Sequence, residues 1–411
     1  MALTPKSSAP APTAAIPPLK DSIFFLRRFR LNHLPPARYA AECLHEAGFS
    51  VLVGEFDEFN AADVPQKNEP LAIRRYRLRR PWWLPRFLHS SKQFLSMVTK
   101  LARACQREGK PRLIIAQGLQ EQFCCLILKQ IFGTPYAVQV HEAYDYDDLK
   151  GFNKLLFLME GPSLRGAEFL VFPGHLRKKT YTERYQLKES SFVVFNTPRV
   201  QLVPERRDLR KELGLSEESF LLGYIGGIGE VNAIEAGIEG IARVPGSHFI
   251  LYGWGEEDYL GKLKSLTRAL KVEERVHFCG PTKDEKWRLF RSFDASYCVY
   301  HSVLLRLQDQ AAPSNKLWES LSVGTPVVVA PNPDSQALVR KYGFGIAVNC
   351  IDGKGIADAI ATLQSKSIRN KMAEKGRHLH LSLFNFETQF QPVKDKILRL
   401  AQSSANIRSK P

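Results

Sequence analysis

Short apolar runs that are typical of buried strands alternate with helical segments along most of this chain. Glycines at positions 48, 109 and 133 end three of the predicted helices. Strands that alternate with helices pair in parallel, because each helix carries the chain back across one face of the sheet. The sequence therefore predicts an α/β protein. In the first half, the predicted strands are residues 23–26, 50–53, 113–116, 136–140, 169–172 and 192–195.

The alternation lapses once and then begins again. Residues 201–213 contain proline and a charged run, a composition typical of a linker. Two doubly wound, Rossmann-like domains would face each other across a cleft at the carboxyl ends of their strands. The second series of predicted strands is residues 220–225, 248–252, 276–278, 295–299 and 327–330. The expected divisions are a disordered Ala/Pro-rich arm at 1–20, an acceptor-side domain at 21–200, the linker at 201–213, a nucleotide-sugar-binding domain at 214–385, and a C-terminal helix and tail at 386–411, for which a return to the first domain is one option.

The composition is that of an ordinary soluble protein. Of 411 residues, 44% are hydrophobic and 24% are charged, and no apolar run reaches the length of about 18 residues that spans a bilayer. Residues 1–20 lack the apolar core of a secretory signal, so we expect a cytoplasmic protein. Seven scattered cysteines, an odd number without metal-ligand spacing, predict neither a disulfide framework nor a metal site.

A net charge of +16 implies an anionic partner, and residues 74–87 carry the densest positive charge. Six arginines there are interleaved with two tryptophans, a tyrosine and a phenylalanine. This mixture suits an anionic membrane surface and a membrane-borne acceptor. Single-stranded nucleic acid and a solvated loop are alternatives, but no nucleic-acid module occurs elsewhere, so no nucleic-acid partner is expected. The residues assigned to the membrane or acceptor surface are Arg74, Arg75, Arg77, Arg79, Arg80, Trp82 and Trp83.

The strongest functional signal is a predicted helix start in the second half. Pro313 and Ser314 suit the first turn and the N-cap of a helix, whose amides attract an anion. Lys316, next to Asn315, adds a positive charge beside those amides. Glu319 follows one helical turn later, where a carboxylate can accept the hydroxyls of a ribose. The segment therefore predicts a nucleotide-sugar site.

Taken alone, the same segment also fits an ordinary helix-to-strand unit with a surface Lys–Glu pair. The two α/β series around it favour the nucleotide-sugar interpretation, because ligands of open α/β sheets bind beyond the carboxyl ends of the strands.

The order of the predicted elements resembles that of GT-B glycosyltransferases, and it is most similar to retaining glycosyltransferase family 4, the glycosyl transferases group 1. The likeness extends over residues 23–400 and is more specific in the second half. Its motifs there are YIGG at 224–227, LYGWG at 251–255, VHFCG at 276–280 and the segment 313–326. In the first half, His141 resembles the strand-end histidine that such enzymes place beside the transferred sugar.

The resemblance implies a nucleotide diphosphate sugar as donor, a glycan or lipid-linked acceptor, and no cofactor or metal. It implies that His141 contacts the sugar near the reacting carbon. Lys316 would contact the diphosphate and Glu319 the ribose. Gly226 and Gly227 would let the diphosphate approach the backbone. Retention of configuration would follow from attack on the leaving-group face, with a phosphate oxygen taking the proton. Further candidates near the sugar or phosphate are Ser335 and Gln336.

Two departures from the family pattern concern the donor. Retaining members usually carry two glutamates separated by seven residues, and Ala311 stands where the first would be. They also carry a basic pair after the glycine turn, whereas this chain has Glu230, whose carboxylate would repel a diphosphate. Arg306 is a candidate for the missing positive charge. For His141, a structural hydrogen-bonding role is the alternative.

Several functions fit these observations. The leading hypothesis is a retaining, hexosyl-type glycosyltransferase that acts on a cell-surface polysaccharide or glycolipid and associates peripherally with the membrane. The two departures favour, as an alternative, a catalytically weak or inactive GT-B protein that serves as a binding or assembly partner. A sugar-nucleotide epimerase would share the architecture, but it needs paired acid–base groups, and no clear pair stands out. A dehydrogenase is weaker still, because residues 226–229 lack the full glycine fingerprint.

Overall fold

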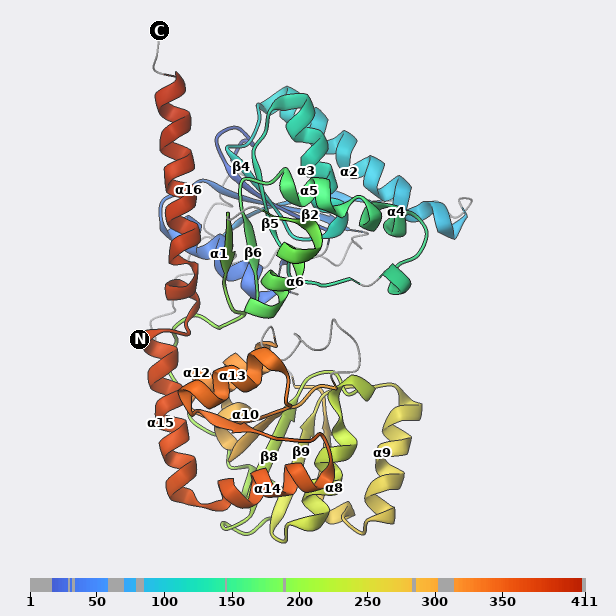
Figure 1. Ribbon diagram of the computed structural model, residues 1–411, viewed down its shortest axis with the longest axis vertical. Helices are drawn as coiled ribbons and strands as arrows, with labels where there is room; N and C mark the ends of the chain where they lie inside the picture. The colour runs from blue at the N-terminus through green and yellow to red at the C-terminus, as the bar shows by residue number, and fades with distance from the viewer. Residues whose placement is uncertain are drawn as a thin grey trace, which may run out of the picture.

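Each half of the chain builds one parallel sheet in the computed structural model. The structure describes residues 17–28, 30–31, 34–57, 70–78, 85–144, 146–187, 190–282, 286–301 and 314–408. Figure 1 shows the two sheets in separate domains that stack along the long axis of the molecule. The predicted α/β class and the two doubly wound domains are confirmed by this arrangement.

The sheet of the first domain has the strand order β3-β2-β1-β4-β5-β6-β7 in the described residues, and every pairing is parallel. The chain winds outward in one direction from β1 to β3 and in the other from β4 to β7. The point where the direction changes therefore lies between β1 and β4. The strands are β1 (Ile23–Arg27), β2 (Val51–Asp57), β3 (Ala72–Arg77), β4 (Leu113–Ala116), β5 (Tyr136–Gln139), β6 (Leu170–Phe172) and β7 (Ser191–Val193).

The central strands are easy to recognise from sequence, and the edge strand β3 is not. Strands β1, β4 and β5 are buried at every residue, so each is a continuous apolar run with little alternation. The sequence predicted β4 with the bounds that the structure shows. The sequence did not predict β3, which carries three arginines and lies at the edge of the sheet, where charged side chains reach solvent.

Helices cover both faces of the first sheet, and two apolar cores lie between the helices and the strands. Helix α3 ends at Gly133, which adopts the left-handed conformation with φ 62° that glycine favours. The helices of this domain are α1 (Pro35–Glu46), α2 (Arg86–Glu108), α3 (Leu119–Phe132), α4 (Phe152–Leu158), α5 (Glu160–Arg165) and α6 (His175–Tyr185), with a short 3-10 turn at Tyr146–Asp148.

The second domain repeats the same winding. Its sheet has the order β10-β9-β8-β11-β12-β13 in the described residues, so the direction changes between β8 and β11. The sequence predicted β8 with the bounds that the structure shows, and it did not predict the short strand β13. The strands are β8 (Phe220–Ile225), β9 (Ser247–Tyr252), β10 (Val276–Gly280), β11 (Ala295–Cys298), β12 (Val327–Val329) and β13 (Gly345–Ala347).

The helices of the second domain pack around one large core and two smaller clusters of buried apolar side chains. Helix α7 (Leu209–Glu212) lies within the residues predicted as linker, because Leu209 is buried against the second domain and the Asp208 carboxylate caps the helix. The remaining helices are α8 (Ile234–Arg243), α9 (Glu257–Ala269), α10 (Lys286–Ser292), α12 (Asn315–Ser322), α13 (Pro333–Tyr342), α14 (Gly353–Gln364) and α15 (Lys366–Ser382), with 3-10 turns at Glu230–Asn232 and Glu273–Arg275.

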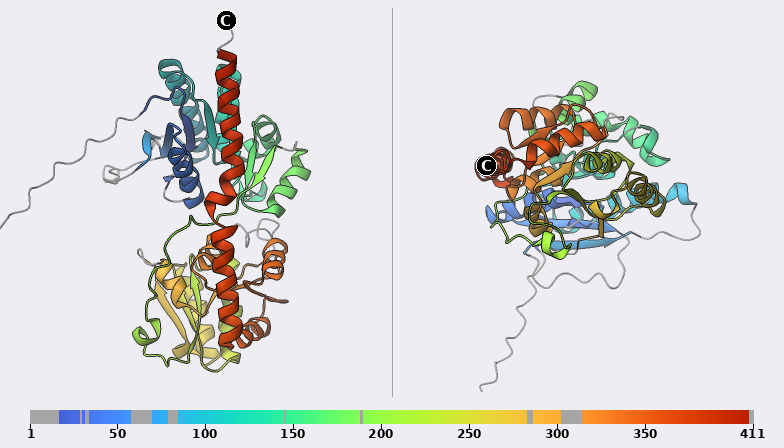
Figure 2. Two further views of the ribbon diagram at one scale, coloured as in Figure 1. Left: turned by 90° about the vertical axis from the view of Figure 1, so that its left-hand side faces the viewer. Right: turned by 90° about the horizontal axis from the view of Figure 1, so that it is seen from below.

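The last helix, α16 (Phe386–Arg408), leaves the second domain and runs beside the first, as both views of the molecule show (Figures 1 and 2). Its apolar residues Phe386, Phe390 and Val393 join the core that α1 forms with the first sheet. Arg199, in the connection between the domains, pairs with Glu46 of α1 at 2.7 Å and with Glu387 of α16 at 2.9 Å. The chain therefore passes between the domains twice, and Arg199 joins the two passages.

Candidate functional site

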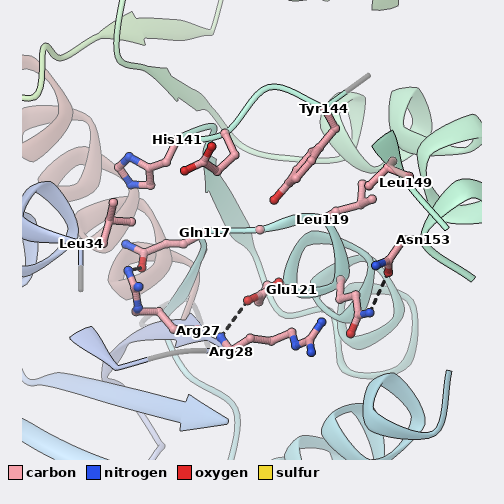
Figure 3. A pocket seen from close by; sticks show the side chains of 13 residues that line it. Arg27, Arg28, Leu34, Gln117, Leu119, Glu121, His141, Tyr144, Leu149 and Asn153 are labelled. Atoms are coloured by element: carbon pink, nitrogen blue, oxygen red, sulfur yellow. Dashed lines mark hydrogen bonds between the residues drawn. The ribbon is translucent and has the colours of Figure 1, made fainter. Parts of the chain in front are cut away.

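The first candidate cavity lies at the carboxyl ends of β1, β4 and β5, beside the point where the winding of the first sheet changes direction. It has a volume of about 370 Å³. Figure 3 shows that its polar side chains come from the loops after these strands and from the start of α3. The cavity is lined by Arg27, Arg28, Leu34, Gln117, Gly118, Leu119, Gln120, Glu121, His141, Glu142, Tyr144, Leu149 and Asn153.

His141 follows β5 and lines this cavity, where it is uncharged at neutral pH. Burial, and then the positive charges of Arg27 and Arg177, lower the pKa of His141 from 6.5 to about 3. The guanidinium of Arg177, on α6, also donates a hydrogen bond to the backbone oxygen of His141. The ring is therefore held as a neutral imidazole that can donate one hydrogen bond and accept one.

A chain of polar side chains fixes which nitrogen of His141 carries the proton. Arg27 has only donors, so the oxygen that accepts from its Nη1 at 2.8 Å must be Oε1 of Gln117. Gln117 then donates through Nε2 to Oε1 of Gln139 at 2.6 Å. Since that oxygen accepts, Nε2 of His141, 3.4 Å away, is the protonated nitrogen. The lone pair lies on Nδ1, which is buried and meets no hydrogen-bonding partner among the described residues.

Glu121 is a second titratable group in the cavity, and the sequence did not single it out. It lies in the first turn of α3 and is 5% exposed, and its carboxylate accepts a hydrogen bond from the backbone N–H of Arg28 at 2.8 Å. Burial raises the pKa of Glu121, although the charge of Arg28 opposes the shift. The signal in the sequence was weak, because an acidic residue at a helix start is common for local reasons.

The second candidate cluster lies at the carboxyl ends of β8 and β11, beside the point where the winding of the second sheet changes direction. Lys316, in the first turn of α12, places its Nζ 4.3 Å from the ring centre of Tyr224 and 4.7 Å from that of Tyr300. The Nζ atom is also 3.3 Å from the phenol oxygen of Tyr224. The sequence predicted Lys316 but missed both tyrosines, because each contact joins segments that are distant in the chain.

Lys316 keeps its positive charge in this aromatic setting. Burial lowers its pKa, but the phenol groups of Tyr300 and Tyr224 outweigh burial, and the net shift is upward. A lysine cation between two aromatic faces is also attracted by the rings themselves. A fixed cation therefore stands at the helix start.

Ser314 occupies the N-cap position of α12, but the expected side-chain cap is absent. The predicted N-cap position is confirmed, but the Ser314 hydroxyl lies 2.8 Å from the hydroxyl of Tyr300 and does not bond the first amides of the helix. Pro313, Arg306 and Ala311 lie outside the described residues. Asn315 begins the helix and is half-buried.

The glycine turn after β8 lies directly beside Lys316. Gly226 has φ 150°, and a Cβ atom on it would stand 3.4 Å from the Nζ atom of Lys316. The backbone oxygen of Gly227 accepts a hydrogen bond from Tyr224, and a Cβ atom on Gly227 would point into open space. The structure thus brings the glycine turn and the lysine into one cluster, as the sequence proposed for a diphosphate.

A second glycine turn, after β9, packs closely against the first. A Cβ atom on Gly253 would lie 1.8 Å from the backbone oxygen of Gly226, and one on Gly255 would lie 2.4 Å from that of Ile228. The first turn also donates a hydrogen bond to the second, from the backbone N–H of Ile228 to the backbone oxygen of Trp254 at 2.7 Å. Glycine is required at these positions because the backbones approach so closely.

Glu319 is held by a partner that the sequence did not reveal. Its carboxylate accepts a hydrogen bond from Nζ of Lys286, on α10, at 2.6 Å. Glu319 is 8% exposed, and after burial its charge is the next cause that raises the pKa of Tyr39 on α1. Glu319 therefore lies where the second domain meets the first. A ribose that binds its carboxylate would do so beside the ammonium group of Lys286, which already occupies one side of it.

The two remaining candidates lie at the start of α13. The Ser335 side chain is buried, and its hydroxyl donates to the backbone oxygen of Asn332 at 3.2 Å. Gln336 is half-buried. On the other face of the same helix, Asp334 accepts a hydrogen bond at 2.8 Å from the backbone of Leu176, in the first turn of α6. This contact ties the two domains together near the candidate site.

Two arginines of the arginine-rich segment form ion pairs within the first domain. Arg74 pairs with Glu108 at 2.7 Å and Arg75 with Glu55 at 3.1 Å, so both guanidinium groups stabilise the domain from β3. Arg77 is exposed at the end of the strand. The other predicted residues of this surface, Arg79, Arg80, Trp82 and Trp83, lie outside the described residues.

The described residues contain no group of three or more His, Cys, Asp or Glu side chains that could hold a metal ion. In the same part of the chain, the helices lack the combination of length and apolar character that crossing a bilayer requires.

Two family models match this chain, one on each domain. The model described as glycosyl transferase 4-like domain matches residues 36–194, and the model described as glycosyl transferases group 1 matches residues 219–366. The chain is similar to the lipopolysaccharide core biosynthesis glycosyltransferase LpsE of Rhizobium meliloti, with 31% identity over 167 residues. That match covers 40% of this chain and 45% of the relative, so it spans less than half of either. The chain is also similar to N-acetyl-alpha-D-glucosaminyl L-malate synthase of Bacillus anthracis, with 21% identity over 74% of this chain and 80% of the relative.

Solved structures share the fold over nearly the whole chain. Sucrose-phosphate synthase from Thermosynechococcus elongatus has a TM-score of 0.71 at 17% identity, over 94% of this chain and 100% of that one. HepE from Anabaena, in complex with UDP, has a TM-score of 0.71 at 16% identity, over 92% and 100%. Because the two family models divide the chain as its two sheets do, and the fold matches throughout, this protein is a glycosyltransferase that belongs to the GT-B glycosyl transferases group 1.

Proposed function

We propose that this protein is a retaining hexosyltransferase that moves a sugar from a nucleotide diphosphate sugar to a cell-surface polysaccharide or glycolipid. The observation that carries the proposal is the cluster of Lys316 and the Gly226 turn at the centre of the second sheet. A fixed cation beside a backbone without side chains is the arrangement that a diphosphate needs. Neighbours of the same fold in complex with UDP and UDP-glucose support this choice of donor.

In the proposed reaction, one domain binds the donor and the other binds the acceptor. The second domain holds the donor through Lys316, the glycine turn and the ribose-binding carboxylate of Glu319. The cavity of the first domain holds the acceptor, and the neutral imidazole of His141 hydrogen-bonds the sugar. A neutral imidazole suits this role, because it adds no charge beside a ring on which positive charge develops.

Retention requires that the acceptor oxygen attack the anomeric carbon from the face that the diphosphate leaves. The bond from the acceptor oxygen to that carbon forms as the bond to the phosphate oxygen breaks, and a phosphate oxygen takes the proton of the acceptor hydroxyl. Lys316 and the first amides of α12 then stabilise the negative charge on the departing diphosphate. Ser335 and Gln336, with Arg306 beyond the described residues, remain candidates for further contacts to the sugar or phosphate.

The acceptor and the location are part of the proposal. The similarity to an enzyme of lipopolysaccharide core biosynthesis favours a glycan or lipid-linked acceptor. A net charge of +16 favours peripheral association with an anionic membrane. Five of the seven cysteines are buried, which suits small core residues of a protein in the reducing cytoplasm.

The test is a transfer assay with a panel of nucleotide sugars, in which proton NMR reports the anomeric configuration of the product. We expect an axial donor linkage to give an axial product linkage. An inverted product would contradict retention. Binding of a nucleotide sugar without transfer or hydrolysis of any donor would favour the inactive binding partner.

Replacement of His141 separates catalysis from donor binding. His141→Ala should lower the transfer rate by roughly a hundredfold, comparable to the loss of one preorganised hydrogen-bonding group. The affinity for the nucleotide sugar should stay the same, because the donor contacts lie on the second domain. Single-turnover kinetics and calorimetry on one preparation measure both quantities, and an unchanged rate would remove His141 from the reaction.

A further inference from the structure

A second cavity of the first domain lies between the end of β3 and helix α2. It has a volume of about 380 Å³. One side is formed by Arg77 and Leu78 at the end of the edge strand. The other side is formed by Lys92, Gln93, Ser96 and Lys100 of α2.

The cavity concentrates positive charge. Lys92, Ser96 and Lys100 are spaced four residues apart, so they lie on one face of the helix, and Arg77 faces them across the cavity. Among the described residues that line it there is no carboxylate. Helix α2 carries a single acidic residue, Glu108 in its last turn, and Glu108 pairs with Arg74. Three positive side chains on facing elements give this cavity a charge that attracts anions.

This basic cavity adjoins the cavity that contains His141. Gln93 lines the basic cavity, is 6% exposed, and accepts a hydrogen bond at 2.9 Å from Nη2 of Arg28. Arg28 lines the His141 cavity. A second link lies nearby, because Gln120 of the His141 cavity donates to the Ser90 hydroxyl of α2 at 2.6 Å. One layer of side chains therefore separates the two spaces.

We propose that the cavity lined by Arg77, Lys92 and Lys100 binds a phosphoryl group of the acceptor. This inference rests on the proposed function, because the neighbouring cavity is where that function places the acceptor glycan. Two lysines and an arginine match the charge of a phosphate, and the hydroxyl of Ser96 adds an uncharged donor for its oxygens. The phosphoryl group belongs either to a phosphorylated glycan or to the headgroup of the lipid that carries it.

The experiment compares two double variants of the full chain. Lys92→Gln with Lys100→Gln removes two charges from the cavity. Arg103→Gln with Arg107→Gln removes two charges from exposed positions of the same helix that do not line it, and it is the matched control. Both variants should remain folded, because they remove like charges from the surface, and thermal melting checks this. The soluble probe is glucose 6-phosphate, with glucose as its neutral counterpart, and the lipid probe is a vesicle of phosphatidylglycerol, with phosphatidylcholine as its counterpart.

We expect the cavity variant to weaken binding of a phosphoryl probe by about tenfold, while the control variant leaves binding unchanged. Weaker binding of glucose 6-phosphate by the cavity variant identifies a phosphorylated glycan as the source of the phosphoryl group. If the cavity variant binds only the phosphatidylglycerol vesicles more weakly, the source is a lipid headgroup. Equal loss in both variants would show a general charge effect and would overturn the proposal, as would unchanged binding of both probes.

Nucleotide-sugar binding by the same variants separates this inference from the proposed function. Both variants should bind the donor as the parent protein does, because the cavity lies on the first domain. If no donor binds to any of the three proteins, the proposed function fails, and the phosphoryl-binding result still decides the role of the cavity.

Discussion

At the scale of single residues, burial and the positive charges of Arg27 and Arg177 keep the imidazole of His141 neutral. No local pattern in the sequence indicates the tautomer of His141, because the tautomer depends on Arg27, Gln117 and Gln139, which lie on three different strands or strand ends. Lys286, Tyr224 and Tyr300 were missed for the same reason. Each acts on a candidate residue from a distant part of the chain.

The tautomer of His141 can be observed directly. We expect the nitrogen NMR spectrum of the imidazole to show a protonated Nε2 and an unprotonated Nδ1 at pH 7. The ring should stay neutral well below pH 6.5, because burial and two arginines lower its pKa to about 3. Gln117→Leu removes the donor that orients Gln139, so it should mix the two tautomers. A parent spectrum with protonated Nδ1 would contradict the hydrogen-bond chain.

At the scale of elements, the predictable parts of the fold were those whose signals are local. Strands β4 and β8 are uninterrupted apolar runs, and the sequence located both with their observed bounds. Strand β3 was not predictable by that rule, because its arginines are compensated by Glu108 and Glu55 from other elements. The composition of this segment predicted a membrane or acceptor surface but did not indicate that its first residues form an edge strand with ion pairs.

The paired glycine turns give an element-scale prediction. Gly253→Ala should lower the free energy of unfolding by about 1–3 kcal/mol, because its Cβ atom would stand 1.8 Å from the backbone oxygen of Gly226. It should also weaken donor binding, since the displaced turn borders Lys316. Gly261→Ala is the matched control: its Cβ atom meets nothing within 4 Å on helix α9, so it should raise stability by about 0.5–1 kcal/mol. Urea unfolding measures both, and equal stability of the two variants would contradict this account of the turns.

At the scale of the whole molecule, both domains place their candidate residues where the winding of a sheet changes direction. His141, Arg27 and Gln117 lie at that point of the first sheet. Gly226 and Tyr300 lie at the corresponding point of the second sheet, after β8 and β11. This equivalence follows from the parallel winding itself, since neighbouring loops diverge there and leave room for a ligand.

Stability should depend on pH through a buried histidine pair in the second domain. Nδ1 of His248 lies 3.2 Å from Nε2 of His277, and burial, then His277 and Arg275, lower the pKa of His248 to about 4. An unfolded histidine titrates near pH 6.5, so between about pH 4 and pH 6.5 the unfolded chain binds more protons and stability falls as the pH falls. Above about pH 6.5 this contribution is complete.

The measurement is the difference in unfolding free energy between the parent protein and His248→Gln, at pH 7.5 and at pH 5. Comparing the two proteins removes the contributions of Glu121 and Glu160, whose raised pKa values act in the opposite direction. The stability advantage of the parent should shrink at pH 5. An advantage that is constant or larger at pH 5 would show that His248 is not held neutral by the fold.

The central claim is that helix α12 holds a nucleotide diphosphate sugar, and calorimetric titration of the donor into Glu319→Ala tests it most directly. Lys286→Met is the matched control, because it breaks the same ion pair but keeps the carboxylate. If Glu319 binds the ribose, Glu319→Ala should lose roughly 1.5–3 kcal/mol of binding free energy, about ten- to a hundredfold in affinity, while Lys286→Met binds at least as well as the parent. Unchanged affinity in Glu319→Ala, or an equal loss in both variants, would contradict the account.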